Sequence, residues 1–214
     1  LVTFGKAIGP NGTAMNTPTW TTAKFGTGLQ FTAASSQYVT FGNDTQLGLS
    51  AFTLEVWVNW TGSGTTASTG TGGVTAIPVL TKGRGEADGD NRDCNYFLGI
   101  TTTGKLVADF EDKVSGANHP VTGNGTIPTN TWTHIAATYS ASGGWSLYIN
   151  GSLDTTESES GAEPRSDSIQ HAGLATAMNS SGATQGYFDG ILDEARVWNY
   201  VRSQVEIQGA MNSE

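Results

Sequence analysis

The 214-residue sequence contains a single cysteine, Cys94, so no disulfide framework can form within the chain. Only 14% of its residues are charged, and basic residues are scarce, with 10 Lys and Arg against 19 Asp and Glu. This balance argues against nucleic acid as a partner, because phosphate binding requires clustered basic side chains. No apolar run approaches the length of a membrane-spanning helix, so we expect no membrane insertion.

Glycine is abundant, with 29 residues, and short apolar runs alternate with clusters of turn residues. This composition is typical of many strands joined by tight turns, and a chain of this length suffices for one large β-sandwich with a real core. The formal net charge of −9 is interpreted mainly as a solubility feature. We expect residues 1–214 to form a single domain, a soluble module within a larger multidomain protein.

The strongest strand pattern occurs in four segments, which are apolar on one or both faces and end in turn residues. They span 52–60, 132–139, 145–151 and 188–198. In this order and spacing they resemble the laminin-G-like branch of the concanavalin A-like lectin/glucanase superfamily. The resemblance covers about residues 19–210 and implies an all-β, two-sheet antiparallel jelly-roll sandwich. A capping-box pattern at Ser203–Glu206 predicts at most one short C-terminal helix.

The resemblance also implies a function. Members of this family are modules of secreted and cell-surface proteins that often bind glycans or proteins and often carry calcium. One turn departs from the family pattern. Residues 32–36 read Thr-Ala-Ala-Ser-Ser and lack the Asp that is common there, so we assign no metal role to this turn.

The densest group of carboxylates lies in residues 84–95. We predict Asp88, Asp90 and Asp93 as calcium ligands, because closely spaced Asp with intervening Gly supplies the oxygen atoms that calcium prefers. The later Glu and flanking helices of an EF-hand are missing, so this is not an EF-hand. The alternative is an ordinary solvated loop rich in turn-forming Asp and Gly.

A predicted hairpin brings further polar residues to this loop. If residues 101–104 form its turn, Tyr96 lies opposite Asp109 and Cys94 lies opposite Glu111. We therefore predict Glu111 as another calcium ligand. The predicted ligand-binding rim consists of polar and aromatic residues near the same loop, namely Asn95, Tyr96, Asp109, Asp112, Asn118 and His119.

Asp193 is a separate metal candidate. The resemblance implies a structural calcium there, while pairing with Arg196 or capping of a strand end is the alternative. Three tryptophans near turns, Trp20, Trp60 and Trp145, are candidates for stacking on sugar rings, although packing is the favoured interpretation. Residues 61–76 contain almost only Gly, Thr, Ser and Ala, which predicts a long mobile loop.

Three functions remain open at this point. The leading one is non-catalytic glycan recognition with calcium-shaped loops, in a secreted or cell-surface protein. The second is a structural or adhesive module that binds protein. The third is a polysaccharide-active enzyme in which Asp109 and Glu111, which share a strand face, form the only plausible carboxylate pair. The Glu-x-Asp-x-x-Glu string of related sandwich glycosidases is absent.

Overall fold

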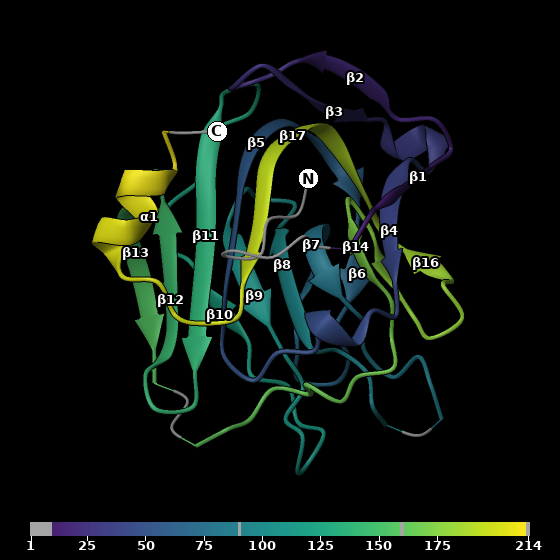
Figure 1. The fold of residues 1–214 in the computed structure, drawn as a ribbon, viewed down its shortest axis with the longest axis vertical. Coiled ribbons are helices and arrows are strands. Elements are labelled where there is room, and N and C mark those ends of the chain that lie inside the picture. The colour runs from purple at the N-terminus through teal and green to yellow at the C-terminus, as the bar shows by residue number, and fades with distance from the viewer. Residues whose placement is uncertain (1–9, 90, 159–160, 213–214) are drawn as a thin grey trace.

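A computed structural model of the protein describes residues 10–89, 91–158 and 161–212. Two antiparallel sheets are packed face to face, and one short α-helix lies beside the edge strand β13 (Ser152–Glu157) (Figure 1). The all-β jelly-roll sandwich expected from the sequence is therefore confirmed.

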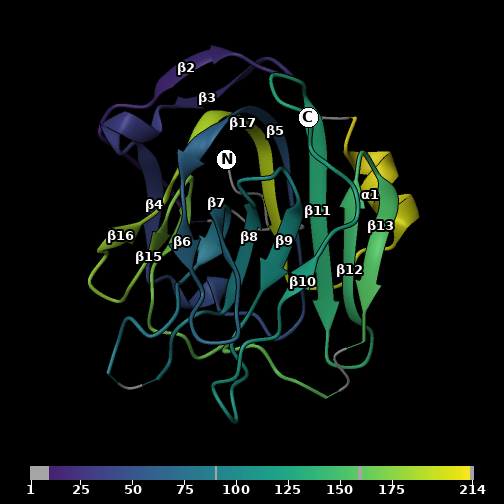
Figure 2. The same cartoon turned by 180° about the vertical axis from the view of Figure 1, so that it is seen from behind.

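The first sheet runs in the order β1, β4, β14, β7, β8, β9 and β10, with β6 paired to β7. These strands are β1 (Thr13–Met15), β4 (Tyr38–Gly42), β14 (Ala172–Leu174), β7 (Thr75–Lys82), β8 (Tyr96–Ile100), β9 (Leu106–Asp109), β10 (Val121–Thr122) and β6 (Ala67–Ser68). In Figure 2, β6, β7, β8 and β9 lie toward the viewer.

The second sheet runs in the order β13, β12, β11, β5, β17, β3 and β2. Its other strands are β12 (Gly144–Ile149), β11 (Thr133–Ser140), β5 (Phe52–Thr65), β17 (Tyr187–Trp198), β3 (Thr27–Phe31) and β2 (Thr19–Thr22). A small separate ribbon joins β15 (Ala177–Met178) to β16 (Thr184–Gln185).

Helical structure is limited to three short segments within the described residues. Two are 3₁₀ turns, η1 (Ala33–Ser35) and η2 (Thr45–Leu47), and the third is α1 (Gln204–Ala210). The predicted capping box is present, because the Ser203 side chain accepts from the Glu206 backbone and the Glu206 side chain accepts from the Ser203 backbone. Ile207 of α1 is buried against Ala136 and Tyr148 on the outer face of the second sheet.

The main core fills the space between the two sheets, because inward residues alternate with outward ones along each strand. In β8, Tyr96, Leu98 and Ile100 belong to this core. Phe97, on the other face, joins a smaller apolar cluster with Val74, Val107 and other residues. This cluster covers part of the outer face of the first sheet, so that face is only partly open to solvent.

Two details of the sequence-based prediction are wrong. The β8–β9 hairpin pairs Phe97, not Tyr96, with Asp109, because its connection spans 101–105 and the register moves by one residue. Residues 61–76 do not form a long irregular loop. Thr65 pairs with Tyr187, and Ala67 pairs with Ala76, because the small side chains let these strands lie close to their neighbours.

Candidate functional site

The acidic loop, residues 84–95, connects β7 to β8, and it is tied down by a distant segment. Gln170 is fully buried, and its Nε2 donates to Asp88 Oδ2 at 2.7 Å and to Asp93 Oδ1 at 2.6 Å. Its Oε1 accepts from the Arg84 backbone N–H at 2.6 Å. One amide therefore holds both ends of the loop and bridges the carboxylates of two predicted calcium ligands.

Asp88 has a further partner in the turn that follows β15. Its Oδ2 accepts from the Ser180 backbone N–H at 3.1 Å, and its Oδ1 accepts from the Ser180 hydroxyl. Burial opposes ionisation, but the hydrogen bonds from Ser180 and Gln170 outweigh it and lower the pKa of Asp88. Asp88 is thus an ionised anchor that joins the acidic loop to the 179–182 turn. Asp90 lies outside the described residues.

Asp109 is fully buried, and both of its oxygens are hydrogen-bonded. Oδ1 accepts from the backbone N–H groups of Phe110 and His119, at 2.8 and 2.9 Å. Oδ2 accepts from the Thr69 hydroxyl at 2.5 Å and from the Val74 backbone at 3.2 Å. Burial nevertheless raises the pKa of Asp109 to about 7. This carboxyl organises three backbone segments and does not face solvent.

Glu111 is also buried and lies beside the acidic loop. Its Oε2 accepts from the Cys94 backbone N–H at 3.2 Å. Burial, followed by the nearby charge of Asp93, raises the pKa of Glu111 to about 8. The predicted proximity of Glu111, Asp93 and Cys94 is therefore found. The Cys94 thiol is buried, and burial raises its pKa well above the ordinary value.

Residues 112–119 form the neighbouring loop. Asp112 accepts from the Val114 backbone and the Ser115 hydroxyl, at 2.7 and 2.8 Å, so its carboxylate stabilises its own turn. Asn118 Nδ2 donates to the Thr71 carbonyl at 3.2 Å, while its Oδ1 is buried without a hydrogen-bond partner among the described residues. The His119 ring stacks on Phe110, with centroids 4.9 Å apart.

Besides Asp109, two further residues of the predicted rim cannot present their side chains to a ligand. Asn95 is buried, and its amide makes a closed pair with the Leu49 backbone, with both hydrogen bonds 2.8 Å long. Tyr96 is fully buried and packs against Phe52, with ring centroids 5.4 Å apart. Strand alternation explains the correction for Tyr96, because it points into the sandwich whereas Asp109 points outward.

Asp193 belongs to a different part of the molecule. It lies in β17 of the second sheet, where its carboxylate accepts from the backbone N–H groups of Phe25 and Glu194, at 2.8 and 2.9 Å. A β-bulge follows Asp193, and Glu194 has a left-handed φ of 50°. Asp193 therefore stabilises the bulge and the β2–β3 turn, in agreement with the capping alternative.

The three candidate tryptophans differ in exposure. Trp60 and Trp145 are buried, and their indole N–H groups donate to the backbone carbonyls of Ser63 and His119. Trp20 is 68% exposed on the edge strand β2, beside a pocket of about 390 Å³. Burial thus leaves Trp20 alone among these three able to stack on a ligand.

The carboxylates described above do not by themselves make a calcium cage. Within the described ranges, no three His, Cys, Asp or Glu side chains converge to hold a metal ion. Calcium takes about six to eight oxygen ligands, whereas both Asp109 oxygens and both Asp88 oxygens are already engaged by protein donors. The calcium assignment therefore remains a prediction.

A sequence model of the concanavalin A-like lectin/glucanases superfamily matches residues 33–208. The chain belongs to this superfamily. A search of curated protein sequences finds no match. No helix among the described residues is long and apolar enough to cross a membrane.

Solved structures of low sequence identity share the fold. Domain 4 of AbnA, an extracellular GH43 arabinanase from Geobacillus stearothermophilus, was solved with arabinotriose; it is 15% identical with a TM-score of 0.61, over 92% of this chain and 86% of that one. The CBM40 of Ruminococcus gnavus IT-sialidase, bound to α2,3-sialyllactose, is 18% identical with a TM-score of 0.57, over 75% and 82%. The SAP-like pentraxin of Limulus polyphemus is 14% identical with a TM-score of 0.52, over 77% and 70%.

Proposed function

We propose that this chain is a non-catalytic carbohydrate-binding module of a secreted or cell-surface multidomain protein. Two proteins with this fold are described with bound saccharides, and one is a domain of an extracellular enzyme. The non-catalytic part rests on one observation. Asp109, half of the only plausible carboxylate pair in the sequence, is fully buried and accepts four hydrogen bonds from the protein itself. A general acid or nucleophile must instead reach the glycosidic bond.

The acidic loops have a structural part in this proposal. Asp88 and Gln170 connect the acidic loop to the 179–182 turn, and Asp109 connects 69–74 to 110–119. We propose that calcium, if it binds the acidic loop, acts by ordering these segments. No sugar contact is assigned to the ion.

A glycan array tests the proposal directly. The protein is applied with calcium, and again after chelation, to neutral and acidic plant, algal, bacterial and animal glycans. We expect selective binding, and no shortening of any bound polysaccharide. Asp109→Asn and Glu111→Gln serve as controls for catalysis. If the wild type hydrolyses a polysaccharide and either variant loses this activity, the protein is an enzyme and the proposal of a non-catalytic module is wrong. An array without any signal would contradict glycan recognition.

Exposed apolar side chains favour the alternative of a protein-binding module. Four large apolar side chains are exposed near α1 and β13, namely Leu153 at 50%, Tyr200 at 42%, Val201 at 43% and Val205 at 77%. Such a group suits a contact with a neighbouring domain. The Val205→Asp variant distinguishes protein binding from glycan binding, because it should impair a protein contact and leave glycan binding unchanged.

A further inference from the structure

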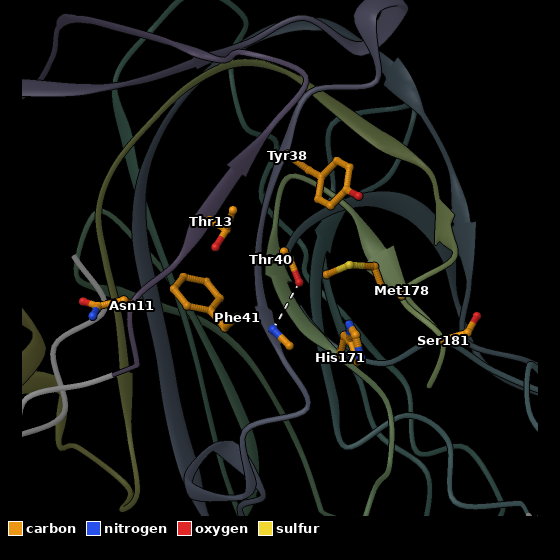
Figure 3. A pocket seen from close by; sticks show the side chains of 10 residues that line it. Asn11, Thr13, Tyr38, Thr40, Phe41, His171, Met178 and Ser181 are labelled. Atoms are coloured by element: carbon orange, nitrogen blue, oxygen red, sulfur yellow. Dashed lines mark hydrogen bonds between the residues drawn. The ribbon is translucent and has the colours of Figure 1, made fainter.

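A groove of about 440 Å³ lies on the first sheet, where β1, β4 and β14 run side by side. Its polar lining consists of Asn11, Thr13, Tyr38, Thr40, His171 and Ser181. In Figure 3, Tyr38, Met178 and His171 lie on one side of Thr40, with Asn11 and Thr13 on the other. The volume is within the ~300–1,000 Å³ of typical small-ligand sites.

Strand alternation and one glycine explain the shape of the groove. Val39 points into the core, so Tyr38 and Thr40 point to the outer face. Gly173 of β14 lies opposite Thr40, and a Cβ there would come within 2.5 Å of Met178 Cε. Because Gly173 has no side chain, Met178 can lie low across the sheet, and the floor remains open beside Thr40.

The wall at residues 179–182 is fixed by hydrogen bonds. Asn179 Oδ1 accepts from the Ser181 backbone at 3.1 Å and from the Ala183 backbone at 2.8 Å. Ser180 is held by Asp88, as described above. The acidic loop therefore supports the wall of the groove through the Asp88–Ser180 hydrogen bonds, and the wall is preorganised for a ligand.

The groove combines an aromatic ring with uncommitted polar groups. Tyr38 is half-buried, and Tyr187 supports its ring, with centroids 6.4 Å apart. In the described part of the chain, neither the Tyr38 hydroxyl nor the His171 imidazole makes a hydrogen bond. This contrasts with the acidic loop, where both oxygens of Asp88 are engaged by Gln170 and Ser180. Aromatic faces stack on the C–H face of a sugar ring, and hydroxyl and imidazole groups can bind its hydroxyls.

The charge of the lining selects among sugars. None of the described residues that line the groove is Lys, Arg, Asp or Glu. Burial, followed by the nearby positive charge of Lys82, lowers the pKa of His171, so this side chain is neutral at pH 7. A sialic acid or uronate would therefore find no cation to pair with its carboxylate, on a chain whose net charge is −9.

We propose that this groove binds a neutral saccharide, with one sugar ring stacked on Tyr38 and its hydroxyls bound by His171 and Thr13. This inference rests on the proposed glycan-binding function and specifies its site and ligand class. The rival stacking residue is Trp20, which lies beside a different pocket and close to Asp193 and Glu194.

The experiment uses neutral probes, including arabinotriose, xylotriose and cellotriose, and acidic probes, including sialyllactose and trigalacturonate. Binding isotherms are measured for the wild type and four variants. Tyr38→Ala removes the stacking ring, and Thr13→Trp fills the groove from an exposed strand position. Trp20→Ala tests the rival site, and Tyr200→Ala is the control for loss of an exposed aromatic ring. Circular dichroism melting curves confirm that each variant is folded.

We expect the wild type to bind at least one neutral probe more tightly than its acidic counterparts. Tyr38→Ala and Thr13→Trp should each weaken binding at least tenfold, with Trp20→Ala and Tyr200→Ala within twofold of wild type. If Tyr38→Ala does not fold, the same loss in folded Thr13→Trp supports the groove. Neutral binding that both groove variants retain would overturn the site and leave the proposed function standing. Preference for acidic probes would overturn the ligand class. No binding across the probes and the array would remove the proposed function, and the groove with it.

Discussion

The acidic loop and the groove lined by Tyr38 both contact the 170–182 segment, and they differ in whether their polar groups are hydrogen-bonded within the protein. In the loop, Asp88, Asp93 and Arg84 are all held by Gln170. In the groove, Tyr38 and His171 line a cavity of about 440 Å³, and their side-chain polar atoms make no hydrogen bond within the described ranges. The comparison teaches that many polar residues in one stretch of sequence mark a site only when the fold leaves their donors and acceptors available.

The largest expected effect is on the acidic loop. Gln170→Ala removes one buried amide that satisfies two carboxylates and a backbone N–H, so we expect a stability loss of about 3 kcal/mol. Urea denaturation measures it, with the exposed Gln30→Ala as the matched control, expected within ~0.5 kcal/mol. Equal, small losses in both variants would mean that the acidic loop is solvated, and the contrast with the groove would disappear.

The second prediction concerns pH. Because the pKa of Glu111 is raised from 4.5 to about 8 in the folded protein, the unfolded chain releases its proton first as pH rises. The contribution of Glu111 to the free energy of unfolding should therefore be fully present below pH 4.5 and should decline as the pH rises toward 8. Glu111→Gln should flatten this decline, as measured by melting temperature with chelator present. If the melting temperatures of the wild type and the variant change in parallel across this pH range, ionisation of Glu111 is not the cause of the decline in stability.

A smaller effect tests the connection between the two regions. Ser180→Ala removes the hydroxyl that donates to Asp88, so the groove wall should loosen and affinity for a neutral glycan should fall about threefold. Ser115→Ala is the matched control, because it removes an equivalent bond to Asp112 on another loop. Isothermal titration provides the affinities. Equal losses of glycan affinity in the two variants would show that the Asp88–Ser180 contact has no specific effect on the groove.

The smallest effect is expected from calcium. If the ion binds the acidic loop, millimolar calcium should raise the melting temperature of metal-stripped protein. The free energy of unfolding would rise by at most ~2.7 kcal/mol at one hundred times the dissociation constant. Because both oxygens of Asp88 are already engaged by Gln170 and Ser180, we expect a shift well below that limit. Identical melting curves with calcium and with chelator would contradict calcium binding at the acidic loop.

Local sequence patterns predicted much of the architecture. The alternation in residues 52–60 and 188–198 indicated paired strands, and the Ser203–Glu206 pattern gave α1. The register of the β8–β9 hairpin was one residue wrong because its connection uses Lys105 as well. Such a slip changes the partner of Asp109 but leaves Asp109 on the outward face.

The site was harder to predict because its contacts are remote. Gln170 is 77 residues from Asp93, and no local signal in the sequence relates them. The groove requires β14 to lie beside β4, with Gly173 opposite Thr40. Nothing in the short segments around Tyr38 or His171 indicates this pairing, whereas the closely spaced carboxylates of 84–95 are conspicuous.

A crystal structure with the neutral oligosaccharide that binds best tests the central claim most directly. The account predicts a sugar ring over Tyr38, hydroxyls within hydrogen-bond distance of His171 or Thr13, and an acidic loop whose Gln170 contacts are unchanged. A saccharide held instead by the carboxylates of the acidic loop, or stacked on Trp20, would contradict it.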